Sequence, residues 1–109
     1  MIVEYERVFG NGFSVFALER FYKKANKLIT EEKYGEVRKL AEERISEKPD
    51  GPYGYWFLGL SYFKTKKWSD AIGSFEKLLV ADPGWKEKIE PYLDRAKSNL
   101  PKQDTEKSE

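Results

Sequence analysis

The fold is decided by residues 55–83, which read YWFLGLSYFKTKKWSDAIGSFEKLLVADP. Apolar side chains recur on both sides of a short polar stretch at the spacing of amphipathic helices, so the segment predicts two helices joined by a turn. The same landmarks occur one repeat earlier, without a gap, at a period of about 34 residues, which is typical of helix–turn–helix repeats. This shift places Gly59 on Ala25, Tyr62 on Leu28, Trp68 on Tyr34, Ala71 on Val37 and Pro83 on Pro49.

The second copy carries the landmarks of a known repeat family. Along the chain these landmarks are Tyr55, Leu58, Gly59, Tyr62, Ala71, Phe75 and Pro83. Their types and spacing resemble the tetratricopeptide repeat. The first copy departs from that pattern, with Lys24 where leucine is usual and Ala25 in place of glycine, but it keeps the register. The resemblance covers most of the chain.

The resemblance implies an all-α fold of stacked antiparallel helix pairs, which is a tetratricopeptide-type α-solenoid. It implies two repeats, at about residues 18–51 and 52–85, followed by a C-terminal capping helix at about 86–100. Gly59 is expected to let its helix approach the next one closely, because it has no side chain, and Ala71 is expected to supply the small surface opposite.

Turn and cap signals set the expected boundaries of the elements. The helices are expected at residues 14–30, 34–47, 52–65, 69–80 and 86–100. Gly10-Asn11-Gly12 reads as a break, so residues 1–13 are predicted to be an N-terminal arm or short extra element before a domain at 14–100. Residues 101–109 contain too little apolar surface to fold and are predicted to be a disordered tail.

Composition excludes several classes of function. Lys and Arg number 20 against 19 Asp and Glu, so no excess positive charge favours nucleic acid or an anionic membrane. The chain has no Cys and no His, which removes thiolate chemistry, the usual zinc sites and imidazole catalysis. The sequence shows no nucleophile beside a base and no glycine-rich phosphate loop. We therefore expect a protein that is not an enzyme, with no cofactor and no metal.

The N-terminal residues, MIVEYERVFGNG, lack the basic and apolar regions of a signal peptide, and no stretch is long enough to cross a membrane. A cytoplasmic location is the expectation. Charged residues make up 36% of the chain, a bias typical of heat-adapted proteins, so a thermophilic source is a hypothesis.

Partner binding is expected on the first helix of each pair, because in arrays of this family those helices line a concave face. The predicted contact residues are Tyr22, Asn26, Ile29, Tyr53, Trp56, Phe57, Leu60, Phe63, Lys64, Glu87 and Glu90.

Trp56 decides how this face is interpreted. Its neighbour Tyr55 takes the landmark position against the partner helix, which leaves Trp56 facing the concave side. Trp56, Leu60 and Phe63 are therefore expected to form an exposed apolar surface of the kind that marks an interaction site. The alternative is that Trp56 is buried against the neighbouring repeat. Trp68, placed in a turn, and Trp85, placed between repeats, are expected to be structural.

Some members of the family hold the terminal carboxylate of a peptide with asparagines and cations. Asn26 is the one counterpart in this chain, since Phe57 replaces the second asparagine and Glu87 replaces a cation. The resemblance therefore disfavours that ligand, which an acidic end would repel.

Two functions remain. The first is a non-catalytic interaction module that binds a peptide or helix of a partner protein on its concave aromatic face. The alternative is a scaffold module that pairs with a second copy of itself through the same face and the N-terminal arm.

Overall fold

The computed structural model describes residues 10–100, and in this part of the chain all regular elements are helical. The elements are α1 (Gly10–Thr30), α2 (Tyr34–Glu47), α3 (Pro52–Lys64), α4 (Trp68–Ala81), the 3₁₀ turn η1 (Pro83–Trp85) and α5 (Lys86–Ser98). The predicted all-α fold of stacked antiparallel helix pairs with a final single helix is confirmed. Most of the predicted N-terminal arm and the predicted tail at 101–109 lie outside the described residues.

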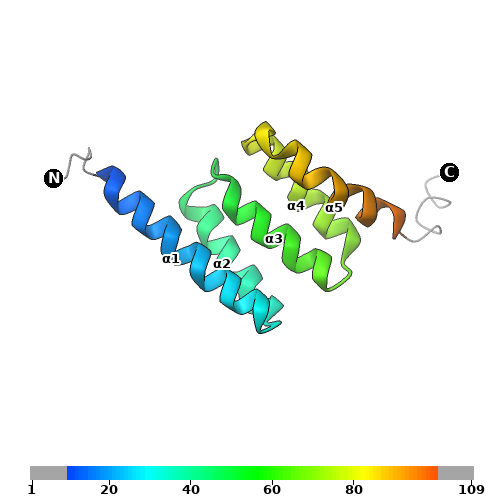
Figure 1. The fold of residues 1–109 in the computed structure, drawn as a ribbon, viewed down its shortest axis with the longest axis horizontal. Helices are drawn as coiled ribbons and strands as arrows, with labels where there is room; N and C mark the ends of the chain where they lie inside the picture. Colours follow the sequence, from blue (N-terminus) through cyan, green and yellow to red (C-terminus); the bar gives the residue numbers. More distant parts are fainter. Residues whose placement is uncertain (1–9, 101–109) are drawn as a thin grey trace.

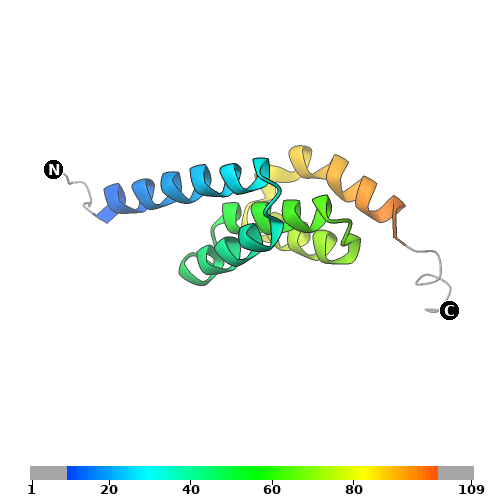
Figure 2. The ribbon, with the colours of Figure 1, turned by 90° about the horizontal axis from the view of Figure 1, so that it is seen from below.

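The helices form two layers. Figure 1 shows α1, α3 and α5 side by side in the front layer, with α2 and α4 behind them. In Figure 2, α1 and α5 rise on either side of α3. The front layer is therefore a trough whose floor is α3 and whose walls are α1 and α5.

The turns that end α1 and α3 have the same backbone geometry. Each contains a non-glycine residue in the left-handed region, Glu32 at φ 61° and Lys66 at φ 64°, and these two stand one repeat apart. In each turn, the left-handed residue and the residue after it donate their N–H groups back to carbonyls in the last turn of the helix, over 2.9 to 3.1 Å. Such bonds satisfy carbonyls that have no partner within the helix. The predicted repeat register is therefore visible in the backbone itself.

Two glycines allow α3 to pack closely on both of its neighbours. A Cβ atom on Gly54 would lie 2.7 Å from Cγ1 of Ile45 in α2. A Cβ atom on Gly59 would lie 2.5 Å from Cε1 of Phe75 in α4. Gly59 does allow the expected close approach of α3 to α4, but the residue predicted to lie opposite is wrong. The phenyl ring of Phe75, not the methyl group of Ala71, fills the space that the missing side chain leaves.

The core runs through both repeats into α5. Its largest fully buried side chains are Val37, Phe57, Phe75, Leu78 and Ile89. Burying a large apolar side chain stabilises the fold by about 1.5–3 kcal/mol, so these residues hold successive helices together. Ile89 belongs to α5, so α5 shares the same core as the two repeats.

Three differences from the predicted boundaries are described here, and the ends of α3, α4 and α5 also differ by one or two residues. Helix α1 begins at Gly10, not Ser14, so the predicted break at Gly10-Asn11-Gly12 is wrong. Glycine and asparagine there occupy the first turn, where backbone N–H groups have no partner within the helix in any case. Trp68 is the first residue of α4 and not part of the turn, and Pro83–Trp85 forms a 3₁₀ turn where only a helix stop was expected.

Between residues 10 and 100, no helix combines the length and apolar character that crossing a membrane would require.

Candidate functional site

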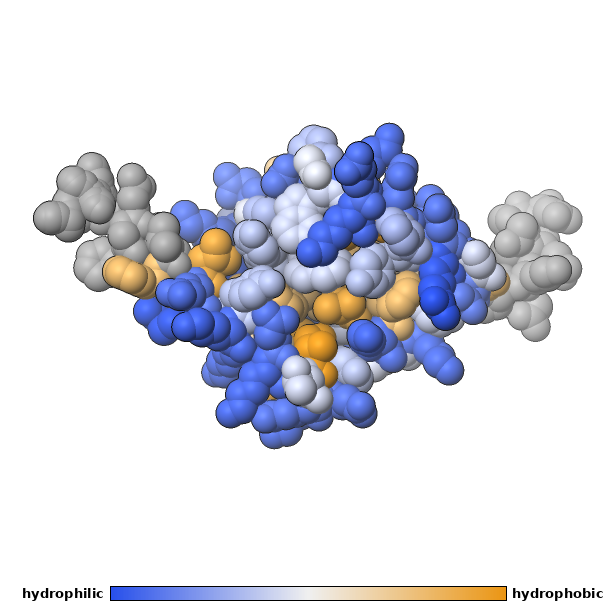
Figure 3. Space-filling view, viewed as in Figure 1, coloured by the Kyte–Doolittle hydropathy of each residue, from blue (hydrophilic) through white to orange (hydrophobic). Residues whose placement is uncertain are grey.

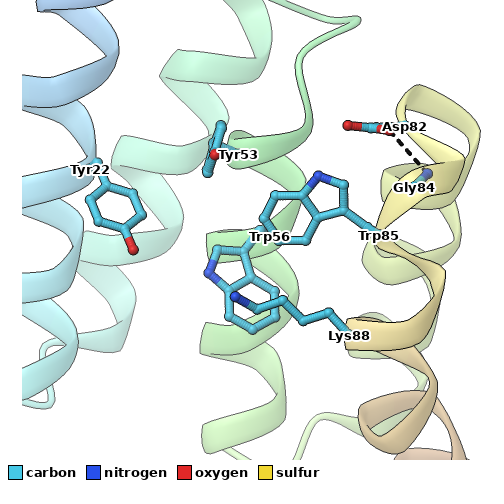
Figure 4. Close-up of a pocket in the computed structure, with 7 residues that line it drawn as sticks. All are labelled: Tyr22, Tyr53, Trp56, Asp82, Gly84, Trp85 and Lys88. Atoms are coloured by element: carbon cyan, nitrogen blue, oxygen red, sulfur yellow. Dashed lines mark hydrogen bonds between the residues drawn. The ribbon is translucent and has the colours of Figure 1, made fainter.

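A cavity lies on the floor of the trough, between α1 and the η1–α5 segment. Its volume is about 410 Å³, and its lining residues, drawn in Figure 4, are Tyr22, Tyr53, Trp56, Asp82, Gly84, Trp85 and Lys88. A second hollow of about 360 Å³ is lined by Leu18, Glu19, Tyr22 and Tyr53. The two hollows share Tyr22 and Tyr53, so they lie next to each other. We call their combined lining the aromatic groove.

Four aromatic rings shape the aromatic groove. The rings of Tyr22 and Tyr53 lie 5.9 Å apart, centroid to centroid, at an angle of 89°. The ring of Tyr53 meets that of Trp85 at 5.3 Å and 85°, and Trp85 lies 5.7 Å from Trp56 at 40°. Edge-to-face pairs at these distances are favourable beyond the area that they bury. The wall changes direction at each ring, so it curves around the cavity.

Tyr22 faces the groove because its neighbour is committed to the core. Phe21 is buried, and its ring lies 5.4 Å from that of Phe57, edge to face. Adjacent helical residues point in different directions, so Tyr22 is left on the trough side with 44% of its surface exposed.

Trp85 is positioned by the turn before it. The side chain of Asp82 accepts a hydrogen bond of 3.0 Å from the N–H of Gly84, which caps the 3₁₀ turn. Pro83 starts this turn, where its missing N–H costs nothing. The chain therefore leaves α4 in a fixed direction, and the indole of Trp85 comes to lie beside that of Trp56 (Figure 4).

Lys88 lies across the two indoles. Its ammonium nitrogen is 5.0 Å from the ring centroid of Trp56 and 5.3 Å from that of Trp85. Both distances fall within the range of cation–π attraction, which is about 6 Å. Among the described residues, no carboxylate lies within 4.0 Å of this ammonium. The aromatic faces are thus its nearest electrostatic partners in this part of the chain.

Figure 3 shows the same face of the molecule as a surface. Pale and orange side chains gather across its middle, over α3, and blue hydrophilic side chains surround them. A centre of low polarity with a charged rim is the usual anatomy of an interaction site.

The structure corrects the predicted exposure of three contact residues. Trp56 and Leu60 are only 8% and 9% exposed and Phe63 is half-buried, so the expected open apolar surface is not present as such; Phe57 beside them is 1% exposed. The cause is the η1–α5 segment, because Trp85 and Tyr92 lie against Trp56 at 5.7 and 5.4 Å. The alternative held for Trp56, burial by its neighbours, is correct, although one edge of it still lines the cavity.

The other predicted contact residues divide into three groups. Tyr22 and Tyr53 line the aromatic groove. Ile29 and Phe63 are half-buried and pack on the core, Phe63 against Trp68 at 5.2 Å. The remaining four are exposed outside the lining of the groove, and their role in binding stays a prediction: Asn26, Lys64, Glu87 and Glu90.

The predicted contact residues do not include four residues of the first hollow, Asp82, Gly84, Trp85 and Lys88, or two of the second, Leu18 and Glu19. Asp82-Pro83-Gly84 was interpreted only as a helix stop, and Trp85 as purely structural. The spacing of Trp85 and Lys88 was the available signal, since residues three apart at the start of a helix share one face. The acidic end expected from Glu87 and Glu90 is not part of the cavity wall, which carries a lysine instead.

The sequence is similar to part of a known co-chaperone. Over 79 residues the chain is 29% identical to a tetratricopeptide repeat and J domain-containing co-chaperone of Fusarium oxysporum f. sp. lycopersici. The match covers 72% of this chain but 15% of the relative, so the chain spans a small part of that protein's length. No protein-family model matches the chain, and no solved structure matches it. The five-helix fold described above and this similarity are both consistent with the predicted tetratricopeptide-type repeat.

Proposed function

We propose that this array of tetratricopeptide-type repeats with a capping helix is a non-catalytic protein–protein interaction module. Its ligand is a peptide or helix of a partner protein, and the aromatic groove is its binding site. The observation that carries the proposal is the exposed ring of Tyr22 at the head of a curved aromatic wall, 44% exposed and facing a cavity of about 410 Å³.

The side chains of the aromatic groove suit this role physically. Tyrosine and tryptophan bury a large area with few rotatable bonds, and both are enriched among the residues that dominate binding energy. Here they are held by three separate helical segments, α1, α3 and η1, so a ligand meets a wall that is already ordered. Binding to an ordered wall costs less conformational entropy than binding to a flexible loop.

The similar co-chaperone supports the same class of function. Its name joins tetratricopeptide repeats to a J domain, and the similarity covers only part of the protein. We infer from this that the present chain contributes an interaction surface of the kind that a repeat array supplies, and that its partner is a protein.

The proposal can be tested with peptides selected from a random library on the full chain. We expect the change Tyr22→Ala to weaken binding of a selected peptide about 30-fold, since truncating a central aromatic residue at an interface typically costs about 2 kcal/mol. Because Tyr22 is half-exposed, thermal melting should move little. Affinity is measured by calorimetry, and melting by circular dichroism.

Val80 offers a matched control. It is 85% exposed on α4, in the rear layer, so the change Val80→Ala removes apolar surface without touching the aromatic groove. We expect unchanged peptide affinity in this variant. Peptides that bind Tyr22→Ala as tightly as the original chain would rule out the groove as their site.

A second candidate function is self-association, and one observation favours it. The N-terminal half of α1 projects beyond α2 (Figures 1 and 2), and Phe16 on this half is 58% exposed. An exposed phenyl ring on a projecting stretch of helix is a feature that a second copy could cover.

Measuring the mass in solution across a dilution series separates the two functions. If the chain is a scaffold, a dimer should persist on dilution, and Phe16→Ser should dissociate it at least about tenfold more readily, because an interface would lose most of an aromatic side chain. A monomer at all concentrations, unaffected by Phe16→Ser, would exclude self-association and leave the partner-binding function.

A further inference from the structure

We propose that the aromatic groove recognises a positively charged side chain, arginine or lysine, of its partner, and that Lys88 occupies the position of this side chain in the free protein. The inference rests on the proposed function, because it names the chemistry of the ligand in the same groove. Three observations carry it: the position of the Lys88 ammonium group over two indoles, the curvature of the aromatic wall, and the charges of the other lining residues when Lys88 moves away.

The position of the Lys88 ammonium group shows that the aromatic wall attracts a cation. The faces of aromatic rings carry negative electrostatic potential, and indole is the strongest of them. The ammonium group of Lys88 lies 5.0 and 5.3 Å from two indole centroids, although its long side chain could extend into solvent from the exposed surface of α5. The ammonium group of Lys88 therefore lies over the indole faces and not in open solvent, although both positions are within its reach.

The aromatic wall continues beyond the reach of Lys88. Figure 4 shows the rings of Tyr22 and Tyr53 on the other side of the cavity from the Lys88 side chain. These rings meet each other at 89°, and Tyr53 meets Trp85 at 85°, so ring faces and edges surround the space from several directions. Aromatic rings on several sides form the arrangement in which proteins hold ammonium groups.

The charges of the lining also favour a cation once Lys88 has moved. The aromatic groove contains two carboxylates, Asp82 at one end and Glu19 at the other, and Lys88 is its one basic residue within the described part of the chain. Asp82 uses its side chain to cap the turn at Gly84, and Glu19 lies 3.6 Å from the exposed ammonium of Lys23. Without Lys88 the lining is negative, which complements an incoming positive charge.

Exchange of the two cations requires little rearrangement. Lys88 is exposed and has no ion-pair partner among the described residues, so leaving the indoles costs it only the cation–π contact and a return to water. An arginine entering in its place can stack its planar guanidinium on the same faces and keep its hydrogen bonds to solvent. Lys88 thus competes with the ligand for the two indole faces. A cation that binds these faces only weakly does not displace it.

The test compares three small probes on three forms of the full chain. The probes are the amides of N-acetylarginine, of N-acetylcitrulline, which has the same shape without the charge, and of N-acetylglutamate. The forms are the original chain, Lys88→Met, and the control Lys86→Met, which removes the same charge from an exposed lysine outside the groove. Binding is followed by the NMR shifts of the indole N–H groups of Trp56 and Trp85, with Trp68 as the internal reference.

We expect Lys88→Met to bind the arginine probe at least about fivefold more tightly than the original chain, because the competing ammonium is gone. Lys86→Met should stay at the original affinity, and the citrulline probe should not gain. Two results would overturn the inference. One is no gain for arginine in Lys88→Met. The other is binding of the glutamate probe to the original chain that disappears in Lys88→Met, which would make the groove an anion site.

The selected peptides separate this inference from the proposed function. Peptides that depend on Tyr22 but contain no common arginine or lysine would leave the interaction module standing and overturn the cation site. Arginine binding with no peptide ligand at all would support the cation site and count against the interaction module.

Discussion

Replacing Trp56 with alanine is expected to lower the free energy of unfolding by about 3–5 kcal/mol, the usual cost of removing a large aromatic side chain from a core. Trp56 is 8% exposed, and its ring lies 6.1 Å from Phe75, 5.7 Å from Trp85 and 5.4 Å from Tyr92. Its loss would leave a cavity among three elements at once. Since small domains are stable by only about 5–15 kcal/mol, the variant should melt far below the original chain. Chemical and thermal unfolding measure the effect.

Trp85→Ala is the matched comparison, because Trp85 contacts Trp56 but is only half-buried at the edge of the aromatic groove. It should destabilise the fold clearly less than Trp56→Ala. If instead Trp56→Ala melts like the original chain, the η1–α5 segment does not pack on Trp56 in solution. The position of α5 against α3 would then have to be revised.

Replacing Gly59 with leucine is expected to cost about 1–3 kcal/mol, because overpacking forces side chains out of their preferred conformations. The first carbon of any side chain at this position would lie 2.5 and 2.6 Å from two atoms of the Phe75 ring. Phe75 is fully buried, so its ring has no solvent to move into. Helices α3 and α4 must therefore separate. The change is read as a drop in the melting temperature.

Gly73 provides the control within the same pair of helices. It lies in α4, and a Cβ atom there would meet nothing within 4 Å. Gly73→Ala should therefore stabilise the chain by about 0.5–1 kcal/mol, the difference in helix propensity. A stable Gly59→Leu variant would contradict the close packing of α3 on α4, whereas opposite signs for the two glycines would support it.

The helices were predictable because their ends carry strong local signals. Helix α2 was expected at 34–47 and is found there, since a turn precedes it and Pro49 with Gly51 follows it. The start of α1 was not, because the cost of glycine in a first turn is small and the residues that follow extend the helix backwards. Gly10-Asn11-Gly12 is therefore compatible with both a break in the chain and the first turn of a helix.

The cavity lies on the layer of α1, α3 and α5, where the concave face was predicted. The apolar residues that were expected to be exposed there are largely buried. Periodicity indicated that Trp56 points away from the partner helix of its own repeat. Its ring lines the cavity but also packs on Phe75 of that partner helix, α4. Its exposure depends on Trp85 and Tyr92, and the direction of Trp85 depends on a 3₁₀ turn capped by Asp82. That turn is a local geometry with weak sequence signals, so neither the cover over Trp56 nor the place of Lys88 followed from the repeat pattern.

The trough gives the parts of this protein unequal freedom to change. Its floor, α3, contributes residues that are needed for folding, so substitutions there are removed whatever they do to binding. Its walls carry Tyr22, Trp85 and Lys88 at positions that are exposed or half-buried. Under the proposed function, the side chains of α1 and the η1–α5 segment that meet a partner can therefore be exchanged at a lower cost in stability than the buried side chains of α3.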